Sequence, residues 1–179
     1  MDIEKNKSQL RKLYRSQRKD RFLSENWLHI LSASEFVNVK NVASYISYEV
    51  EPDTSEINKQ LIAVGKNLFL PRLLADGDIE WVPWDGSKEK LKATGKSFEP
   101  IGDAQIVDLD VIIVPALHVD RTGMRLGQGG GSYDRALAKS RAWKIALLHR
   151  GELTSELLPT QSHDQKVDAA ATPEIIVRF

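Results

Sequence analysis

A glycine-rich loop between a predicted strand and a predicted helix constrains this chain more than any other stretch. Five of the eleven glycines fall within the nine residues from Gly123 to Gly131. Residues 111–115 before the loop form an apolar run typical of a buried strand, and residues 133–138 after it favour a helix. In this arrangement backbone N–H groups and a helix N-terminus converge on an anion. The sequence therefore predicts an α/β fold whose loop holds the phosphates of a nucleotide.

The loop matches none of three common glycine fingerprints. Gly131 is followed by Ser132 and Tyr133, so the lysine of a Walker loop is missing. Ser132 also replaces the third glycine of a dinucleotide fingerprint, and Asp134 replaces the last glycine of a nucleophile elbow. A phosphate cradle of another kind remains, with Arg125 near a transferring phosphoryl group and Asp134 available for magnesium. A purely structural glycine hinge is the alternative.

Strands and helices alternate through most of the 179 residues, which predicts a single α/β domain over residues 1–179. We expect three α/β/α layers around a mostly parallel, Rossmann-like sheet with an added hairpin at Ala75-Asp76-Gly77. Predicted helices are residues 4–22, a second one capped by Ser24, 54–64, 133–138 and 152–158. Predicted strands are residues 41–48, 67–74, 78–84, 111–115, 143–149 and 175–179.

Charge is balanced overall but unevenly distributed. The chain has 25 basic and 25 acidic residues, and residues 1–21 carry eight Lys/Arg against three acids. A zero net charge gives no indication of a nucleic-acid partner. Lys7, Arg11, Arg15 and Arg18 share one face of the first helix. That face is either ordinary solvated surface or a basic arm that reaches over an anionic ligand, and the pattern does not choose between them.

Composition also bears on the compartment. The chain has no cysteine, which fits a reducing environment. No apolar run approaches the roughly 18–20 residues that span a bilayer, and the first residues are charged. We therefore expect a cytoplasmic protein with no membrane partner.

Two polar loops and two tryptophans are further candidates. Residues 49–53 carry three acids at the carboxyl end of a predicted strand, where open α/β sheets place ligand groups; loop solubility is the alternative. His163 and Asp164 offer an oxygen ligand for a cation or a simple surface turn. Trp81 and Trp84 suit packing or a wall beside a flat ligand.

Several motifs together resemble the 5-formyltetrahydrofolate cyclo-ligase family. The loop resembles the family's Gly-x-Arg-Leu-Gly-x-Gly-x-Gly-Tyr-Tyr-Asp signature. Other matching segments lie in the same order along nearly the whole chain. They are Lys7-x-x-Leu-Arg11, Glu51-x-x-Thr54, Leu70-Pro-Arg72, Val114-Pro115 and His163-Asp-x-Lys-Val-Asp168.

The resemblance implies ATP-dependent conversion of 5-formyltetrahydrofolate to 5,10-methenyltetrahydrofolate, with release of ADP and phosphate. It implies that the formyl oxygen attacks the γ-phosphate before N10 closes the ring, with Arg125 as the catalytic residue. It also implies magnesium held by Asp134 and Asp164, and folate contacts at Ile46, Glu51 and residues 128–132. The implied ATP-binding residues are Lys7, Arg11, Arg125, Leu126, Gly127, Gln128, Gly129, Gly130, Gly131, Ser132 and Tyr133.

The chain departs from the pattern where Ser132 replaces the first of two tyrosines. Gln128 and Gly130 also stand where relatives can carry a basic residue, which shifts phosphate binding toward backbone N–H groups and Arg125. A non-catalytic folate- or nucleotide-binding protein is the main alternative, and a sugar-phosphate or CoA-ester enzyme is a weaker one. We expect a monomer or a weak homo-oligomer.

Overall fold

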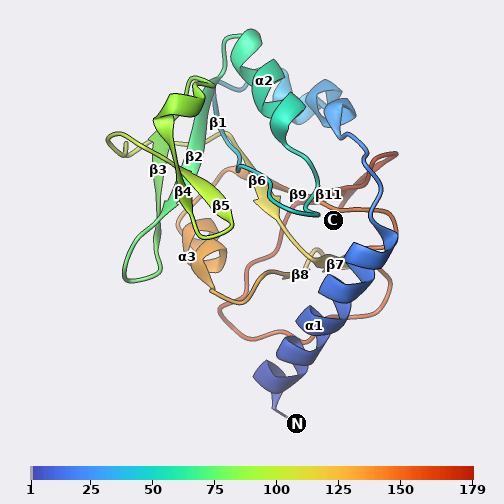
Figure 1. The fold of residues 1–179 in the computed structure, drawn as a ribbon. Helices are drawn as coiled ribbons and strands as arrows, with labels where there is room; N and C mark the ends of the chain where they lie inside the picture. The colour runs from blue at the N-terminus through green and yellow to red at the C-terminus, as the bar shows by residue number, and fades with distance from the viewer. Residues whose placement is uncertain (1) are drawn as a thin grey trace.

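The computed structural model describes residues 2–179. A seven-stranded sheet forms the middle layer, in the order β12-β11-β9-β6-β1-β2-β3 (Figure 1). Its five inner strands are parallel, and β3 and β12 pair antiparallel at the two edges. The mostly parallel sheet is confirmed. Its strands are β1 (Asn41–Ala43), β2 (Asn67–Leu73), β3 (Ile79–Pro83), β6 (Val111–Pro115), β9 (Trp143–Leu147), β11 (Ala169–Ala171) and β12 (Ile176–Arg178).

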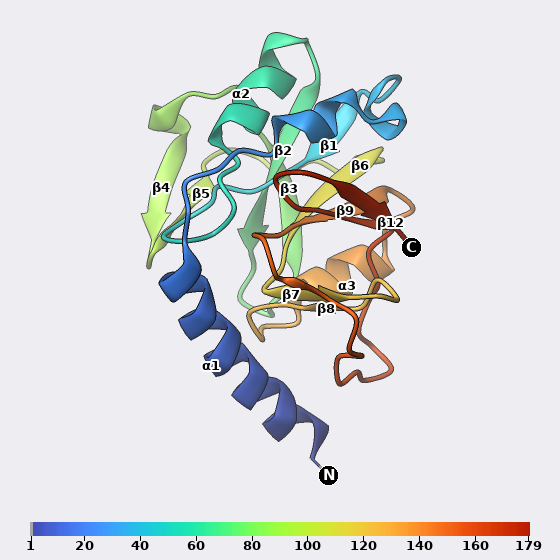
Figure 2. The ribbon, with the colours of Figure 1, turned by 90° about the vertical axis from the view of Figure 1, so that its right-hand side faces the viewer.

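Both faces of the sheet are buried. Val111 and Ile113 of β6 join one apolar cluster, and Ile112 and Val114 join a second one on the opposite face. Burial on both faces explains why the strand is a continuous apolar run rather than an alternating one. The first cluster includes residues of α2 (Ser55–Ala63) and of the 3-10 helices η1 (Leu28–Ser32) and η2 (Ser34–Phe36), and the second includes α3 (Ser132–Ala138). The three layers are visible in Figure 2.

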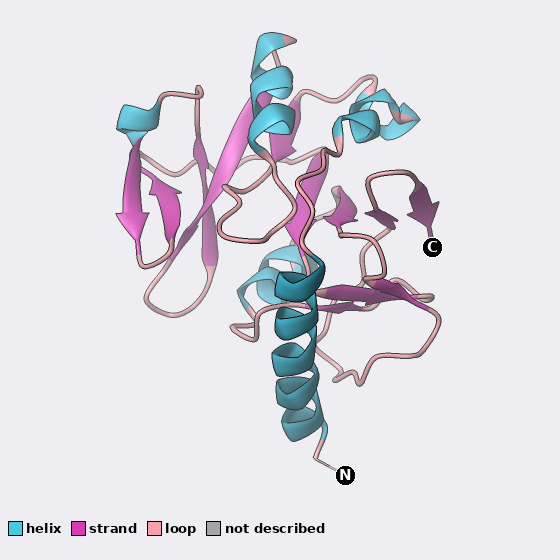
Figure 3. Cartoon of the chain, turned by 45° about the vertical axis from the view of Figure 1, so that its right-hand side comes forward, coloured by secondary structure: helices cyan, strands magenta, loops and turns pink. Residues whose placement is uncertain are grey.

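Two small sheets extend this framework. β7 (His118–Asp120) pairs with β8 (Arg125–Leu126) and with β10 (Leu153–Thr154). A short 3-10 helix, η3 (Lys88–Lys90), leads into a hairpin of β4 (Leu91–Thr94) and β5 (Ser97–Pro100). The N-terminal helix α1 (Ile3–Arg21) stands apart from the central layers (Figure 3). It packs against the first small sheet, where Tyr14 stacks on His118 with ring centres 3.5 Å apart.

Two predicted helices are wrong. Residues 152–158 contain only the short strand β10, because the Glu152 carboxylate is bound to Arg18 and Leu158 N–H donates to Asp120. After Ser24 the chain forms the 3-10 helix η1, which has no side-chain cap. The predicted strand 41–48 is regular only over β1. Within residues 2–179, no helix combines the length and apolar character needed to cross a membrane.

Candidate active site

A cavity of about 600 Å³ opens at the carboxyl ends of β1 and β6. Numbered along the chain, the five parallel strands follow the order 2-1-3-4-5, in which β1 and β6 are neighbours whose connections leave in opposite directions. Open α/β sheets bind ligands at such a switch point. Tyr45 and Ile46 after β1 and Pro115 at the end of β6 line the cavity. The predicted position of the site, at strand ends, agrees with this geometry.

The structure brings every site residue predicted from the sequence to this one cavity. The first helix, the loop after β1, the glycine loop and the segment before β11 each contribute to its wall. The predicted residues that line it are Lys7, Arg11, Ile46, Glu51, Arg125, Leu126, Gly127, Gln128, Gly129, Gly130, Gly131, Ser132, Tyr133, Asp134 and Asp164.

The glycine loop contains consecutive backbone N–H groups that have no hydrogen-bond partner within residues 2–179. Among the described residues, no protein acceptor takes the N–H groups of residues 127 to 134. Gly129 and Gly131 have φ angles of 111° and 68°, which residues with a Cβ rarely adopt. Gly129 also approaches α1 closely, since a Cβ there would lie 3.3 Å from the Arg11 guanidinium. The glycines therefore allow the left-handed backbone path of the loop and its close approach to Arg11 of α1.

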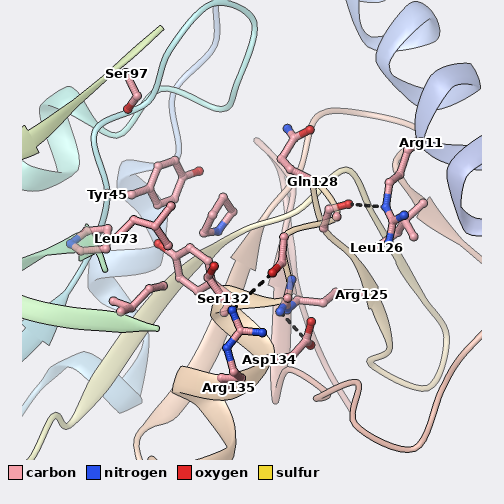
Figure 4. A pocket seen from close by; sticks show the side chains of 18 of the residues that line it. Arg11, Tyr45, Leu73, Ser97, Arg125, Leu126, Gln128, Ser132, Asp134 and Arg135 are labelled. Atoms are coloured by element: carbon pink, nitrogen blue, oxygen red, sulfur yellow. Dashed lines mark hydrogen bonds and ion pairs between the residues drawn. The ribbon is translucent and has the colours of Figure 1, made fainter. Parts of the chain in front are cut away.

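Arg125 is the buried cation of the cavity. Its side chain is only 3% exposed, and its guanidinium forms an ion pair with Asp134 at 2.9 Å (Figure 4). The guanidinium also lies 5.9 Å from the centre of the Tyr133 ring. Burial lowers the pKa of Arg125, and its Nε has no partner among the described residues. Arg125 lines the cavity as a buried positive charge, and such a charge is suited to an anionic ligand.

The first helix holds the site from the other side. Lys7 is 5% exposed and donates to Asp164 at 2.5 Å, and Arg11 Nε donates to Gly127 O at 3.2 Å. Burial raises the pKa of Asp164, but hydrogen bonds from Lys7 and from the Gln161 N–H outweigh it and leave that pKa below its usual range. At Lys7 and Arg11, the basic face is thus part of the cavity wall rather than solvated surface.

Glu51 lines the cavity from the loop after β1. It is 9% exposed, and its carboxylate accepts from the Tyr48 N–H at 3.2 Å. Burial raises the pKa of Glu51 to about 7. The nearby hydroxyls of Tyr45 and Tyr133 are buried and have no protein partner within residues 2–179. Glu51 is therefore part of the cavity wall rather than an exposed loop carboxylate. The cavity around it combines apolar side chains with a few unpaired polar atoms, as small-molecule sites do.

Comparison with known proteins identifies the family. Residues 3–173 match the family described as "5-formyltetrahydrofolate cyclo-ligase family". The chain belongs to the 5-formyltetrahydrofolate cyclo-ligase family. The 5-formyltetrahydrofolate cyclo-ligase of Escherichia coli K12 is 33% identical over 146 residues, which cover 76% of this chain and 80% of the relative. The corresponding protein of Mycolicibacterium smegmatis is 32% identical over 156 residues, covering 77% and 76%.

A solved structure of the family shares the fold. The 5,10-methenyltetrahydrofolate synthetase of Aquifex aeolicus superimposes with a TM-score of 0.79 and 28% identity, covering 96% of this chain and 92% of that one. The family resemblance drawn from the glycine loop and its companion motifs is confirmed, as is the α/β fold class.

The two carboxylates expected to hold magnesium in this cyclo-ligase family member are already paired with cations. Asp134 Oδ1 accepts from Arg125 and from the Gln165 N–H, and Asp164 Oδ2 accepts from Lys7. The second oxygen of each carboxylate accepts no hydrogen bond from residues 2–179. Those residues contain no cluster of three or more His, Cys, Asp or Glu able to enclose a metal. The donor set fits a magnesium ion that takes most ligands from phosphate and water, not one caged by protein.

Sequence reasoning missed several residues of the cavity. Tyr45 precedes Ile46 at the same strand end, and that position was a usable signal. Arg15 does not line the cavity itself, but it lies one helical turn after Arg11 and contacts the glycine loop through Gln128. The basic spacing did not distinguish it from solvated neighbours. Phe98 and Ser97 of the β4–β5 hairpin also line the cavity, and no motif marks them. Trp81 and Trp84 pack against the two core clusters, so packing was the correct interpretation.

Proposed function

We propose that this cavity binds ATP and 5-formyltetrahydrofolate together and converts the folate to 5,10-methenyltetrahydrofolate, releasing ADP and phosphate. The family match and the shared name of the relatives support this activity. The observation that carries the assignment of roles is the row of free N–H groups at residues 127–134, which shares one cavity with Lys7, Arg11 and Arg125.

The triphosphate is proposed to lie along the glycine loop. Free N–H groups there offer several donors without side-chain rearrangement, and Arg125 supplies a buried positive charge. Lys7 and Arg11 close the site from α1. Within the loop, Leu126, Ser132 and Tyr133 complete the proposed ATP contacts, with Arg125 as the catalytic residue.

The folate is proposed to occupy the end of the cavity near Glu51. An ionised Glu51 accepts hydrogen bonds from the amino and N–H donors of a pterin, and Ile46 provides an apolar contact beside it. Five further residues that line the cavity are proposed to border both ligands: Gln128, Gly129, Gly130, Gly131 and Ser132. The formyl group would thereby meet the γ-phosphate over the loop.

The reaction divides into two steps at this boundary. The formyl oxygen attacks the γ-phosphorus, and the bond from the γ-phosphorus to ADP breaks. The N10 amine then attacks the activated formyl carbon. The ring closes as the bond from that carbon to the phosphate oxygen breaks, and the phosphate carries away the N10 proton. Arg125 neutralises charge on the transferring phosphoryl group, and the free N–H groups hold its oxygens in line. Asp134 and Asp164 are proposed to hold magnesium through their free oxygens. Bound there, the ion would offset the charge of the phosphates.

A turnover assay tests the proposal. Pure protein with 5-formyltetrahydrofolate, ATP and magnesium is expected to produce the absorbance of methenyltetrahydrofolate, and to lose this activity without magnesium. Arg125→Ala and Asp134→Ala are each expected to lower the rate at least about tenfold, roughly 1.4 kcal/mol of barrier. Lys59→Ala on α2 is the control, because Lys59 is exposed and does not line the cavity. No turnover beside an active reference enzyme would overturn the proposal, and ATP binding without phosphate release would favour a binding protein instead.

A cytoplasmic location and a monomeric or weakly self-associating state stay predictions, as does the expectation of no nucleic-acid or membrane partner. Gel filtration and fractionation of cells that express the protein would test the first two.

A further inference from the structure

Gln128 is the one residue with a side chain among the glycines from Gly127 to Gly131. Arg15 of α1 forms two hydrogen bonds with it. Arg15 Nε donates to Gln128 Oε1 and the Arg15 Nη2 donates to Gln128 O, both at 2.9 Å. A guanidinium has donors only, so it must face the oxygen of the amide. The NH₂ group of Gln128 is consequently turned away from Arg15 and toward the cavity.

Glu51 lines the same cavity as Gln128. The influence of the nearby Gln128 amide favours the charged form of the Glu51 carboxylate, against the burial that raises its pKa to about 7. Arg18 on α1 favours the charged form as well, and Glu49 opposes it. The buried hydroxyls of Tyr45 and Tyr133 face the same carboxylate from the strand end and from α3.

We propose that Arg15 is a positioning residue for folate binding: by fixing the Gln128 amide it directs the Gln128 NH₂ to Glu51 and holds that carboxylate in place as an acceptor. This inference rests on the proposed function, since it gives Glu51 the pterin. It links α1, which closes the ATP end of the cavity, to the folate end through a single loop side chain. Without Arg15, Gln128 loses the two hydrogen bonds that fix its orientation.

The geometry distinguishes Arg15 from a general positive charge. Its planar fork reaches a side-chain oxygen and a backbone oxygen of the same residue. Lysine has a single flexible ammonium and would not fix both atoms together. Charge alone would make Arg15→Lys equivalent to the natural chain, whereas the positioning role requires the fork.

Lys12 supplies a matched control. It lies on the same helix, is exposed, and has no hydrogen bond or ion pair within residues 2–179. Lys12→Ala removes the same charge from α1 without touching Gln128. Thermal unfolding of each variant confirms that the helix is retained.

The experiment measures steady-state turnover from pH 6 to 9 for Arg15→Ala, Arg15→Lys, Gln128→Ala, the Arg15→Ala/Gln128→Ala double variant and Lys12→Ala. Arg15→Ala is expected to raise the KM for 5-formyltetrahydrofolate about fivefold, the effect of one hydrogen bond. It is expected to shift the acid limb of kcat/KM to higher pH. Arg15→Lys does not restore either value. In the Gln128→Ala background Arg15→Ala has a much smaller effect than in the natural chain, because the side chain through which it acts is gone and only its contact with the backbone oxygen of residue 128 remains.

Three results would overturn the inference: equal profiles for Arg15→Ala and Lys12→Ala, full activity of Arg15→Lys, or additive effects of Arg15→Ala and Gln128→Ala. A carboxyl ¹³C NMR titration of Glu51, with Glu51→Gln for assignment, measures the link without turnover. Its pKa is expected to rise in Arg15→Ala and Gln128→Ala and to stay unchanged in Lys12→Ala. If the pKa of Glu51 changes in this way but the protein shows no turnover, the proposed function is wrong and the link from Arg15 to Glu51 stands. If the protein turns over substrate but the pKa of Glu51 does not change, the proposed function stands and the link is wrong.

Discussion

The ionised Glu51 carboxylate destabilises the folded protein, and its proposed role in folate binding explains why the residue is there. Its pKa in the folded chain, about 7, lies above the ordinary value of 4.5 because the carboxyl is buried. Between these two pH values the folded chain binds the proton more tightly than the unfolded chain does. The contribution of Glu51 to stability is therefore most favourable below about pH 4.5 and is lost as pH rises through 7.

Glu51→Gln is accordingly expected to stabilise the protein at pH 8 by about 1–3 kcal/mol and to change stability little at pH 4.5. Denaturant unfolding at the two pH values measures this difference. The same variant is expected to lose at least about tenfold in kcat/KM, since it removes a charged acceptor. A variant that is active but not stabilised at pH 8 would contradict both expectations.

Ser132 is the residue at which this chain departs from the family pattern. It begins α3 and lines the cavity, and Gly131 before it has the left-handed conformation that the turn needs. Ser132→Tyr is expected to lower the KM for folate about threefold, because an aromatic ring there would add a stacking contact. Ser132→Thr is the control, and an unchanged KM in both would show that this position does not touch the folate.

At the scale of elements, the buried ion pair between Arg18 and Glu152 is one of the contacts that attach α1. Arg18 and Glu152 are both nearly inaccessible, and Arg18 donates to both carboxylate oxygens at 2.6 and 2.7 Å. Arg18 also donates to Ala116 O at the end of β6. Removing one partner of such a pair leaves the other charge buried without compensation.

Arg18→Met is therefore expected to lower the free energy of unfolding by about 3–5 kcal/mol. Lys59→Met, in an exposed pair with Glu56, is expected to change it by less than about 0.5 kcal/mol. Urea denaturation measures both. A loss near zero in Arg18→Met would mean that α1 is held by its other contacts.

Elements whose character depends on local pattern were predictable from the sequence, and those fixed by distant partners were not. The apolar run 111–115 and the turn at Gly77 specify β6 and the β2–β3 hairpin locally. Residues 152–158 have helix-forming composition, but the distant partners of Glu152 and Leu158 impose an extended path. The role of Arg15 was hidden for the same reason, since its partner lies 113 positions away.

At the scale of the whole molecule, the net charge of zero results from two segments of opposite charge. Residues 1–21 carry an excess of five positive charges, and the remaining chain carries an equal negative excess. The positive excess lies on α1, two of whose basic residues, Lys7 and Arg11, line the cavity. The residues predicted from the motifs line one cavity because the motifs lie at strand ends and on α1, whereas no motif marks the β4–β5 hairpin, which adds Phe98 to the cavity wall.

The KM for ATP is expected to rise about two- to fivefold between 50 and 300 mM salt, because added ions screen the attraction of α1 for the triphosphate. Steady-state kinetics in sodium chloride measure the slope. Arg11→Gln is expected to flatten it, and an unchanged slope would show that α1 does not attract the nucleotide from solution.

The long-range contacts of α1 also bear on when this helix can dock during synthesis and folding. Lys7 meets a partner 157 positions later, and Arg18 meets one 134 positions later. The ribosome makes α1 before either of these partners, so a nascent chain that stops short of residue 152 lacks both ion pairs. Until then, the buried charges of Lys7 and Arg18 have only water to solvate them. A helix that is made early is thus fully secured late.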